Sequence, residues 1–271
     1  MKQSEWYRQW FDENYLLVYS HRDKREAADF ASLWPIWKYL KPGGWCLDLG
    51  CGTGRYAYEI QKRGLNVLGI DLSAPLLKIA QSVRNNQYHT ARSIWFVRAD
   101  MRSLPIMSGV NTRHNLTNTR HNFSGGPFSL IVSLFTSFGY FDDNEHLQII
   151  RQIRKLLLPD GIFIIDIPNP VSVRKTVSDK PVTIRTVNGV NIKEERYIDE
   201  KACRVIKEIE IERQGRKQKY YESVKLFNIE ELKALLKLNG IKQIEDCWGD
   251  YQGTRFELES PRIIYFGKVN G

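Results

Sequence analysis

The stretch CLDLGCGTGRY, residues 46–56, decides the fold of this 271-residue chain. An apolar strand that carries one acid, Asp48, runs into glycines at alternate positions, Gly50, Gly52 and Gly54. Glycines at such a turn let backbone N–H groups approach a ligand closely, and the helix that follows offers its positive end. The stretch therefore predicts a strand, a turn and a helix that together bind a nucleotide-like ligand.

Strands and helices alternate on both sides of this stretch. Helices are expected after Gly54, from Ser73 and over 143–157, and two more, 4–19 and 24–40, precede the first strand. Several of the strands are continuously apolar, which is typical of a parallel sheet covered on both faces. The expected strands are 45–49, 66–71, 93–100, 128–135 and 161–168.

Residues 182–226 do not follow this alternation of strands and helices. They read as antiparallel strands with turns at 188–189, 199–200 and 214–215, followed by a helix over 228–240 and two final strands, 241–249 and 262–268. The expected organisation is a helical cap over 1–44, an α/β core over 45–181, an antiparallel insertion over 182–226, and a helix with a β-hairpin over 227–271 that completes the core sheet.

The segment NTRHNLTNTRHN, residues 111–122, repeats one pentapeptide and places two histidines seven positions apart. It is polar, has no hydrophobic periodicity and is followed by FSGGP. Such composition favours an inserted, flexible loop over residues 108–126 rather than a metal site.

Composition limits the cellular setting. No run of about 18 apolar residues occurs, so no membrane span is expected. The N-terminus lacks the plan of a signal peptide. The four cysteines, Cys46, Cys51, Cys203 and Cys247, lack metal-ligand spacing. We therefore expect a cytoplasmic protein without a metal.

The formal net charge is +9, and a basic surface attracts nucleic acid. Lysines and arginines are interleaved with acids, however, as in residues 193–225. That pattern is typical of a solvated face of strands, so a nucleic-acid partner is not favoured.

The residues around the glycines distinguish between possible ligands. A phosphate-binding Walker loop requires Lys and Ser or Thr after the last glycine, where this chain has Arg55 and Tyr56. A dinucleotide fingerprint requires glycine at position 55. Asp48, two residues before the first glycine, suits a ligand with an ammonium group better than a pyrophosphate. The pattern therefore favours S-adenosylmethionine.

Two further acids support this prediction. Asp71 ends the next strand, where a carboxylate can accept both ribose hydroxyls, and Asp100 ends the third strand, where it can hold the adenine amino group. Each could instead cap the helix that follows. Three acids at the carboxyl ends of successive strands nevertheless line one crevice, which is where open α/β sheets bind ligands.

At these motifs the sequence resembles the class I S-adenosylmethionine-dependent methyltransferases, over about residues 45–167 and the C-terminal third. The resemblance implies an α/β, Rossmann-like fold, with a seven-stranded, mostly parallel sheet, helices on both faces and an antiparallel last strand. Within the family the chain is most similar to small-molecule methyltransferases, which carry an N-terminal helical cap and a small antiparallel β insertion. The matching segments are LDLGCGTGRY (47–56), GIDLS (69–73), RADMRSLP (98–105), FSLIVSLFTSFGYF (128–141) and LLLPDGIFIIDIPNP (156–170), with Asp160 where glycine is commoner.

The expected cofactor is S-adenosylmethionine and the expected product S-adenosylhomocysteine. The residues expected to bind the cofactor are Tyr19, Arg22, Asp48, Gly50, Gly52, Asp71, Leu72, Asp100, Met101 and Leu134. The expected substrate-binding residues are Tyr15, Phe135, Ser137, Tyr140 and Asp250. No catalytic base stands out, because His21 and His146 look like surface residues.

The cofactor's sulfonium makes its methyl group a strong electrophile, so an amine or carboxylate acceptor needs little acid–base help, whereas a hydroxyl usually needs a base. The missing base therefore favours an amine or a carboxylate on a small molecule. The alternative is an RNA- or DNA-modifying methyltransferase, but residues 133–141, SLFTSFGYF, lack the Pro-Pro of base-amino methyltransferases. A cofactor-binding protein without activity is a third possibility.

Overall fold

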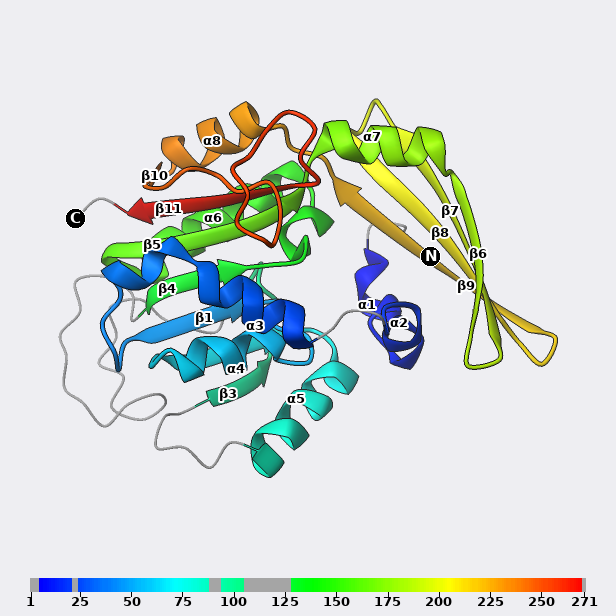
Figure 1. Ribbon diagram of the computed structural model, residues 1–271, viewed down its shortest axis with the longest axis horizontal. Helices are drawn as coiled ribbons and strands as arrows, with labels where there is room; N and C mark the ends of the chain where they lie inside the picture. The colour runs from blue at the N-terminus through cyan, green and yellow to red at the C-terminus, as the bar shows by residue number, and fades with distance from the viewer. Residues whose placement is uncertain (1–4, 21–23, 88–93, 105–127, 270–271) are drawn as a thin grey trace.

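A seven-stranded sheet forms the centre of the molecule (Figure 1). The computed structural model describes residues 5–20, 24–87, 94–104 and 128–269; the repeat at 111–122 and the loop predicted over 108–126 lie outside them. The strand order is β10-β11-β5-β4-β1-β2-β3. The strands are β1 (Trp45–Leu49), β2 (Asn66–Asp71), β3 (Ile94–Arg98), β4 (Phe128–Ser133), β5 (Leu157–Pro168), β10 (Ile241–Gln243) and β11 (Arg262–Val269).

The pairing within this sheet confirms the predicted fold. β1 to β5 run parallel to one another, and β11 pairs antiparallel with both β5 and β10. The strand predicted over 241–249 is shorter, because β10 ends at Gln243. No helix within the described ranges is long and apolar enough to span a bilayer.

Helices cover both faces of the sheet, which explains why its strands are continuously apolar. Along β5, Ile162 and Ile164 belong to one buried cluster, and Phe163 and Ile165 belong to the other. The first cluster is covered by α3 (Lys24–Leu33), α4 (Arg55–Lys62) and α5 (Ala74–Gln87), and the second by α6 (Asp143–Leu156) and α8 (Ile229–Leu238).

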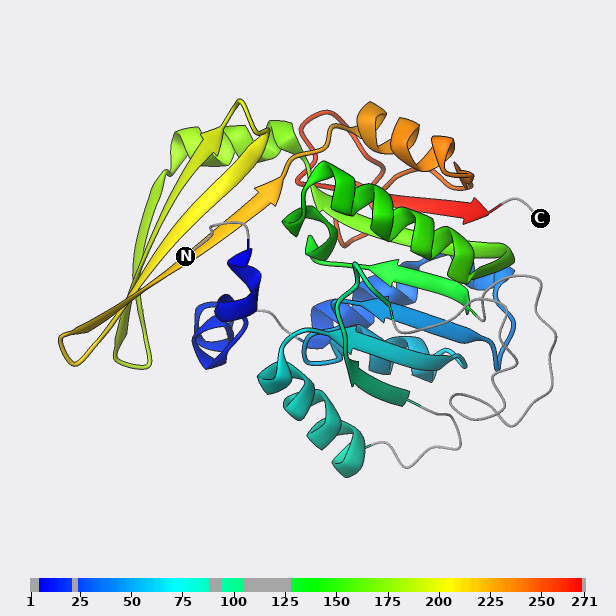
Figure 2. The same ribbon diagram turned by 180° about the vertical axis from the view of Figure 1, so that it is seen from behind.

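A separate antiparallel sheet stands beside the carboxyl ends of the core strands (Figures 1 and 2). Its strands, in spatial order, are β6 (Val182–Val187), β7 (Val190–Asp199), β8 (Arg204–Arg213) and β9 (Arg216–Lys225). The first and last turns carry Asn188-Gly189 and Gln214-Gly215 with positive φ throughout, as two-residue hairpin turns require. The helix α7 (Pro170–Asp179), which the sequence analysis did not predict, leads into this sheet.

The N-terminal helices are shorter than predicted. The segment 4–19 forms α1 (Tyr7–Trp10) and α2 (Glu13–Val18), separated because the Asp12 side chain caps the start of α2. The segment 24–40 divides at Trp34, before a proline, into α3 and the 3₁₀ helix η2 (Pro35–Tyr39). α1 and α2 lie between the antiparallel sheet and the carboxyl ends of the core strands (Figures 1 and 2).

Two reciprocal hydrogen bonds cap the N-terminus of α8. The Asn228 side chain accepts from the Glu231 amide at 2.8 Å, and the Glu231 carboxylate accepts from the Asn228 amide at 3.0 Å. Replacing this cap, Asn228→Ala, should lower the free energy of unfolding by about 1 kcal/mol in denaturant titrations. Asn228→Asp, which keeps an acceptor, should stay close to wild type; equal losses in both variants would contradict the capping role.

Candidate functional site

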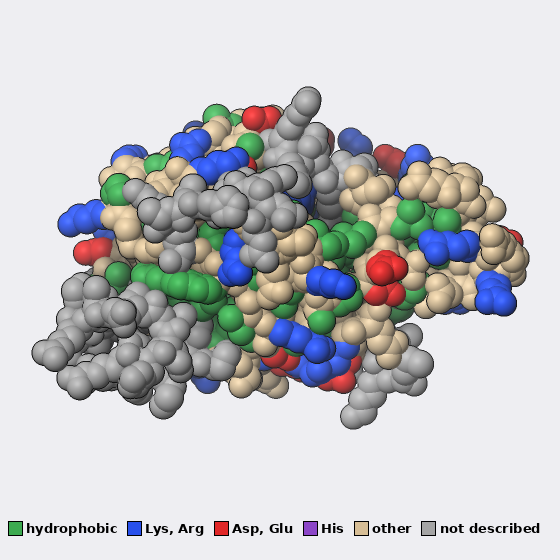
Figure 3. Space-filling model, turned by 90° about the horizontal axis from the view of Figure 1, so that it is seen from below, with side chains coloured by type: hydrophobic (Ala, Val, Ile, Leu, Met, Phe, Trp, Pro, Cys, Tyr) green, Lys and Arg blue, Asp and Glu red, His purple; other side chains and the backbone are tan. Residues whose placement is uncertain are grey.

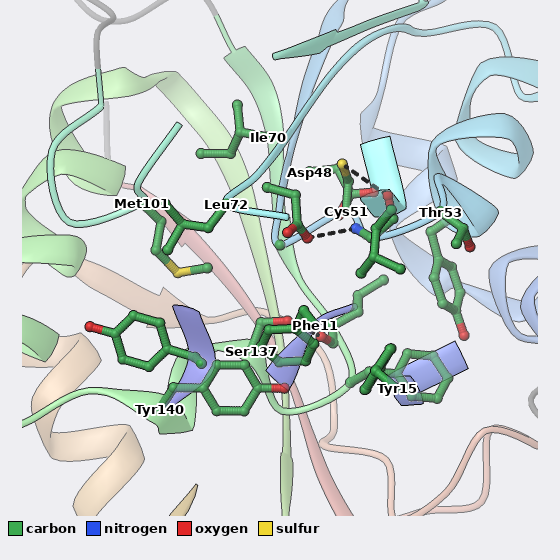
Figure 4. A pocket seen from close by; sticks show the side chains of 18 of the residues that line it. Phe11, Tyr15, Asp48, Cys51, Thr53, Ile70, Leu72, Met101, Ser137 and Tyr140 are labelled. Atoms are coloured by element: carbon green, nitrogen blue, oxygen red, sulfur yellow. Dashed lines mark hydrogen bonds between the residues drawn. The ribbon is translucent and has the colours of Figure 1, made fainter. Parts of the chain in front are cut away.

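A pocket opens where the carboxyl ends of the core strands meet α1 and α2 (Figure 4). Its walls come from the glycine-rich turn, the ends of β2 and β4, and the N-terminal helices. It brings together twelve of the predicted residues: Tyr15, Tyr19, Asp48, Gly50, Gly52, Asp71, Leu72, Met101, Leu134, Phe135, Ser137 and Tyr140.

The glycine-rich turn is held by the end of β2. The Gly50 and Cys51 amides both donate to the Ile70 carbonyl at 2.9 Å, and the Gly52 amide donates to Asp71 Oδ2 at 2.8 Å. Gly50 has φ of +73°, and a Cβ atom there would lie 2.7 Å from Ser137 Oγ. Only glycine fits this position, because the turn packs directly against the residues that follow β4.

The Asp48 side chain is 2% exposed, and its Oδ2 atom has no hydrogen-bond partner within the described part of the chain. Burial raises the pKa of its carboxyl group to about 7, and the Asp71 charge adds to the rise while Arg55 opposes it. A buried acceptor without a donor is costly. A cationic group placed in the pocket would supply that donor.

Asp71 is held by backbone amides. Its Oδ2 accepts from Gly52 and its Oδ1 accepts from Ser73, each at 2.8 Å. Burial raises the pKa of its carboxyl group, although these amides act in the opposite direction. A carboxylate has about four acceptor positions, so two remain for a ligand.

The lining residues fit S-adenosylmethionine, because they offer an unsatisfied carboxylate for its ammonium group. We propose that Asp48 would receive that group, and that Asp71 would accept from the ribose hydroxyls. The apolar side chains of Leu72, Met101 and Leu134, which line the same pocket, would contact the remaining surface of the cofactor.

Three predicted residues are not brought to the pocket. Asp100 does not line it; both of its oxygens accept from Arg102, so the carboxylate is already engaged. Burial favours a higher pKa for this carboxyl group, but the Arg102 bonds outweigh burial and lower it. Asp250 accepts from the Gln252 and Thr254 amides within its own turn. Arg22 lies outside the described residues.

The residues that follow β4, 135–141, form what we call the β4–α6 turn. Phe135 and Thr136 have φ of +52° and +73°, which is unusual for non-glycine residues and requires support. The buried Asp166 gives that support: its side chain accepts from the Phe135 amide at 2.8 Å and from Tyr251 Oη at 2.9 Å. Arg262 Nε donates to the other oxygen of Asp166 at 2.7 Å.

Aromatic rings from the N-terminal helices close the pocket. The Phe11 ring lies 4.8 Å from that of Tyr15 and 5.6 Å from that of Tyr140, between ring centroids. Tyr19 Oη donates to Glu222 of β9 at 2.7 Å, which ties this wall to the antiparallel sheet. Sequence reasoning missed Tyr7 and Phe11, and only the high aromatic content of residues 6–19 hinted at them.

His146, one of the two histidines considered as bases, does not line this pocket. His146 is 1% exposed, its Nε2 lies 2.8 Å from the Phe138 carbonyl, and it is absent from the lining. Burial is the main reason that its pKa falls to about 4, so the ring stays neutral. The surface position expected for His146 is therefore wrong, and His21 lies outside the described residues.

Asp71→Ala should weaken binding of S-adenosylhomocysteine by about 1–3 kcal/mol, because it removes acceptors for hydroxyl groups and the partner of the Gly52 amide. Isothermal titration of the purified variant measures this loss. Asp250→Ala is the matched control, since that carboxylate caps a turn outside the pocket. Unchanged affinity in Asp71→Ala would remove Asp71 from the site.

The raised pKa of Asp48 predicts a pH-dependent stability. The folded chain holds this proton more tightly than the unfolded chain, so the stability that Asp48 contributes is present below its ordinary pKa of about 4. It is lost as the pH rises through about 7. Without ligand, Asp48→Asn should therefore be more stable than wild type at pH 8, and the two should converge at low pH.

S-adenosylhomocysteine at pH 8 should stabilise the wild type more than Asp48→Asn, because its ammonium group would meet the ionised carboxylate. Thermal unfolding with and without ligand measures both effects. A pH profile shared by the two proteins would contradict the account of Asp48.

Residues 46–161 match the family model described as "Methyltransferase domain". Among curated proteins, the chain is 23% identical over 240 residues to a Bacillus subtilis protein with the name "Putative methyltransferase YqeM". This match covers 86% of the chain and 87% of YqeM.

Solved structures of methyltransferases share the fold. An S-adenosylmethionine-dependent methyltransferase from Clostridium acetobutylicum superposes with a TM-score of 0.73 at 20% identity, covering 94% of this chain and 96% of that one. The CcbJ methyltransferase from Streptomyces caelestis gives 0.73 at 18% identity, with 100% of both chains covered. The match and the pocket at the glycine-rich turn lead to one conclusion: residues 46–161 form a methyltransferase domain, and its pocket has a lining that fits S-adenosylmethionine.

Proposed function

We propose that the chain transfers the methyl group of S-adenosylmethionine directly to the nitrogen of a small-molecule amine. The observation that carries this proposal is the set of ionisable groups in the pocket. Its described lining holds two aspartates, one cysteine, one arginine and five tyrosines, and no histidine. Burial raises the pKa of the Cys51 thiol well above its ordinary value, so this group stays protonated.

Because the pocket holds no strong base to deprotonate the acceptor, the acceptor must already be nucleophilic when it binds. A neutral amine does so, whereas a hydroxyl would need deprotonation. Bound S-adenosylmethionine supplies an electrophilic methyl group. The pocket residues align the acceptor nitrogen behind that methyl group, and such alignment can supply about 7–11 kcal/mol of the acceleration in favourable cases.

The aromatic walls suit this reaction. Tyr15 of α2 and Tyr140 of the β4–α6 turn both line the pocket, and Phe11 lies between them. Aromatic faces attract cations, and they keep water away from the reacting groups. The same walls would hold the methylated ammonium product until it loses a proton.

Two relatives support an amine on a sugar. The chain is 27% identical over 158 residues to a Streptomyces fradiae protein named dTDP-3-amino-3,6-dideoxy-alpha-D-glucopyranose N,N-dimethyltransferase, covering 57% of the chain and 51% of that protein. The sugar N-methyltransferase KedS8 superposes with a TM-score of 0.62 at 18% identity. We therefore rank nucleotide-linked amino sugars first among the amines to be tried.

The charge around the pocket supports a small acceptor over a nucleic acid. Arg55 is the only basic side chain in the described lining, and its guanidinium lies 4.7 Å from the centre of the Phe135 ring. Figure 3 shows lysines and arginines in separate small groups on one face, several beside acids. A strand-binding groove would need a continuous basic surface.

Methyl-labelled S-adenosylmethionine tests the proposal. We expect the purified chain to transfer label to acid-soluble amines, first to a panel of nucleotide-linked amino sugars, and not to transfer RNA included in the same reaction. Heating the product in alkali separates carboxylate acceptors from amine acceptors, because methyl esters release volatile methanol and N-methyl groups do not. Label in the acid-precipitated RNA would contradict the proposal, and volatile label would replace the amine by a carboxylate.

A further inference from the structure

Arg204, the first residue of β8, reaches out of the antiparallel sheet to the β4–α6 turn. Its Nη1 donates to the Phe141 carbonyl at 2.9 Å, and its Nη2 lies 3.1 Å from the carbonyl oxygens of both Gly139 and Tyr140. Its Nε donates to Ser223 Oγ of β9 at 2.7 Å. One guanidinium group therefore binds three successive carbonyls of the turn and the neighbouring strand.

The partners of Arg204 are unusual for an arginine. They are carbonyl and hydroxyl oxygens, and no carboxylate among the described side chains lies within ion-pair distance of this guanidinium. Burial lowers the pKa of Arg204, but a guanidinium remains charged in proteins. A planar, charged donor group makes strong and directional hydrogen bonds. The arrangement fixes the orientation of backbone groups rather than neutralising a charge.

Packing brings the turn and the sheet into direct contact at the same place. A Cβ atom on Gly139 would lie 2.7 Å from Val224 Cγ1 and 3.4 Å from the Lys225 carbonyl, both on β9. The backbone of the turn therefore lies against this strand with no room for a side chain. Lys225 also pairs with Asp143, at the start of the helix that follows the turn, at 3.1 Å.

The turn held in this way carries the part of the pocket wall that packs against α1, where the Phe141 ring lies 5.4 Å from the Tyr7 ring. Phe135, Ser137, Tyr140 and Phe141 all line the pocket. The other end of the turn is fixed by Asp166, which belongs to the core sheet. A change at Arg204 would therefore move the Tyr140 end of the wall, while Asp48 and Asp71 would stay in place.

We propose that Arg204 is a positioning residue for methyl transfer: it holds the Gly139–Phe141 backbone so that Tyr140 presents the acceptor to the methyl group. This inference rests on the proposed function, because it assigns the wall of the turn to the acceptor. It gives the antiparallel sheet a role beyond covering the pocket, since the sheet sets the geometry of a residue that would contact the substrate.

The test compares Arg204→Met and Arg204→Lys with Arg213→Met, a control at the exposed far end of the same strand. Hydrogen–deuterium exchange of the full chain, saturated with S-adenosylhomocysteine, reports on the turn and requires no acceptor. We expect the amides of residues 137–141 to exchange about tenfold faster in Arg204→Met than in the control. Arg204→Lys should be intermediate, because an ammonium has three donors and cannot replace the five hydrogen bonds that the planar guanidinium makes to the turn and to Ser223.

Kinetics with the amine found by the labelling screen give the second measurement. Arg204→Met should lower kcat/KM for the amine by about tenfold to a hundredfold, because a small displacement of an aligning group is costly. The KM for S-adenosylmethionine and the affinity for S-adenosylhomocysteine should stay within about twofold of wild type. This separation distinguishes positioning of the acceptor from a general loss of structure.

Exchange and kinetics equal to those of Arg213→Met would overturn the role of Arg204 and leave the proposed function intact. If the wild type methylates no amine, the proposed function fails. Faster exchange of the turn in Arg204→Met would then support only the claim that Arg204 holds the Gly139–Phe141 backbone. If Arg204→Met does not fold, Arg204→Lys decides: wild-type exchange and kcat/KM in that variant would overturn the inference.

Discussion

The buried carboxyl group of Asp48 sets the main physical constraint on this molecule. One of its oxygens lacks a hydrogen-bond partner within the described structure, and a second acid, Asp71, lies close enough to raise its pKa further. The unliganded fold therefore carries two carboxyl groups in a poorly solvated place. A ligand with an ammonium group and neighbouring hydroxyls relieves this cost, and the glycine-rich turn leaves it room to approach. The same two carboxyl groups therefore supply both the binding energy for the cofactor and the selectivity for a ligand with an ammonium group.

The cover over this site depends on the antiparallel sheet. α1 and α2 have four and six residues, which is too short for helices that stand alone. The sheet supplies their support: Tyr19 bonds to Glu222, and Arg185 donates to the Val18 carbonyl at 2.8 Å. The sheet also binds the β4–α6 turn through Arg204. Both walls of the pocket therefore rest on one element, which links acceptor recognition to the part of the chain that least resembles a minimal methyltransferase core.

Much of the core could be predicted because its signals are local. Apolar strands that end in an acid and enter a glycine-rich turn determine both the parallel sheet and the positions of Asp48 and Asp71. Asp100 carries the same signal, but the structure pairs it with Arg102 and leaves it out of the pocket lining. Asp250 likewise caps its own turn. A strand-end acid can therefore be located from the sequence, whereas its partner depends on side chains that no motif specifies.

The helical segments show a different limit. α7 has its N-cap, Asn169, and a proline in its first turn, but its β-branched and polar residues favour other conformations, and docking beside β7 decides the outcome. Phe11 and Tyr7 line the pocket, while Trp10 is fully buried in the core. The sequence shows one aromatic segment in which pocket and core residues look alike, so only the tertiary packing separates them.

A crystal structure of the chain with S-adenosylhomocysteine tests this account most directly. We expect the ammonium group of the ligand to lie at Asp48, its ribose at Asp71, and its sulfur to face a space enclosed by Tyr15 and Tyr140. A ligand bound elsewhere would contradict the site. A sulfur atom that faces an open channel lined by lysines and arginines would contradict the small-molecule acceptor.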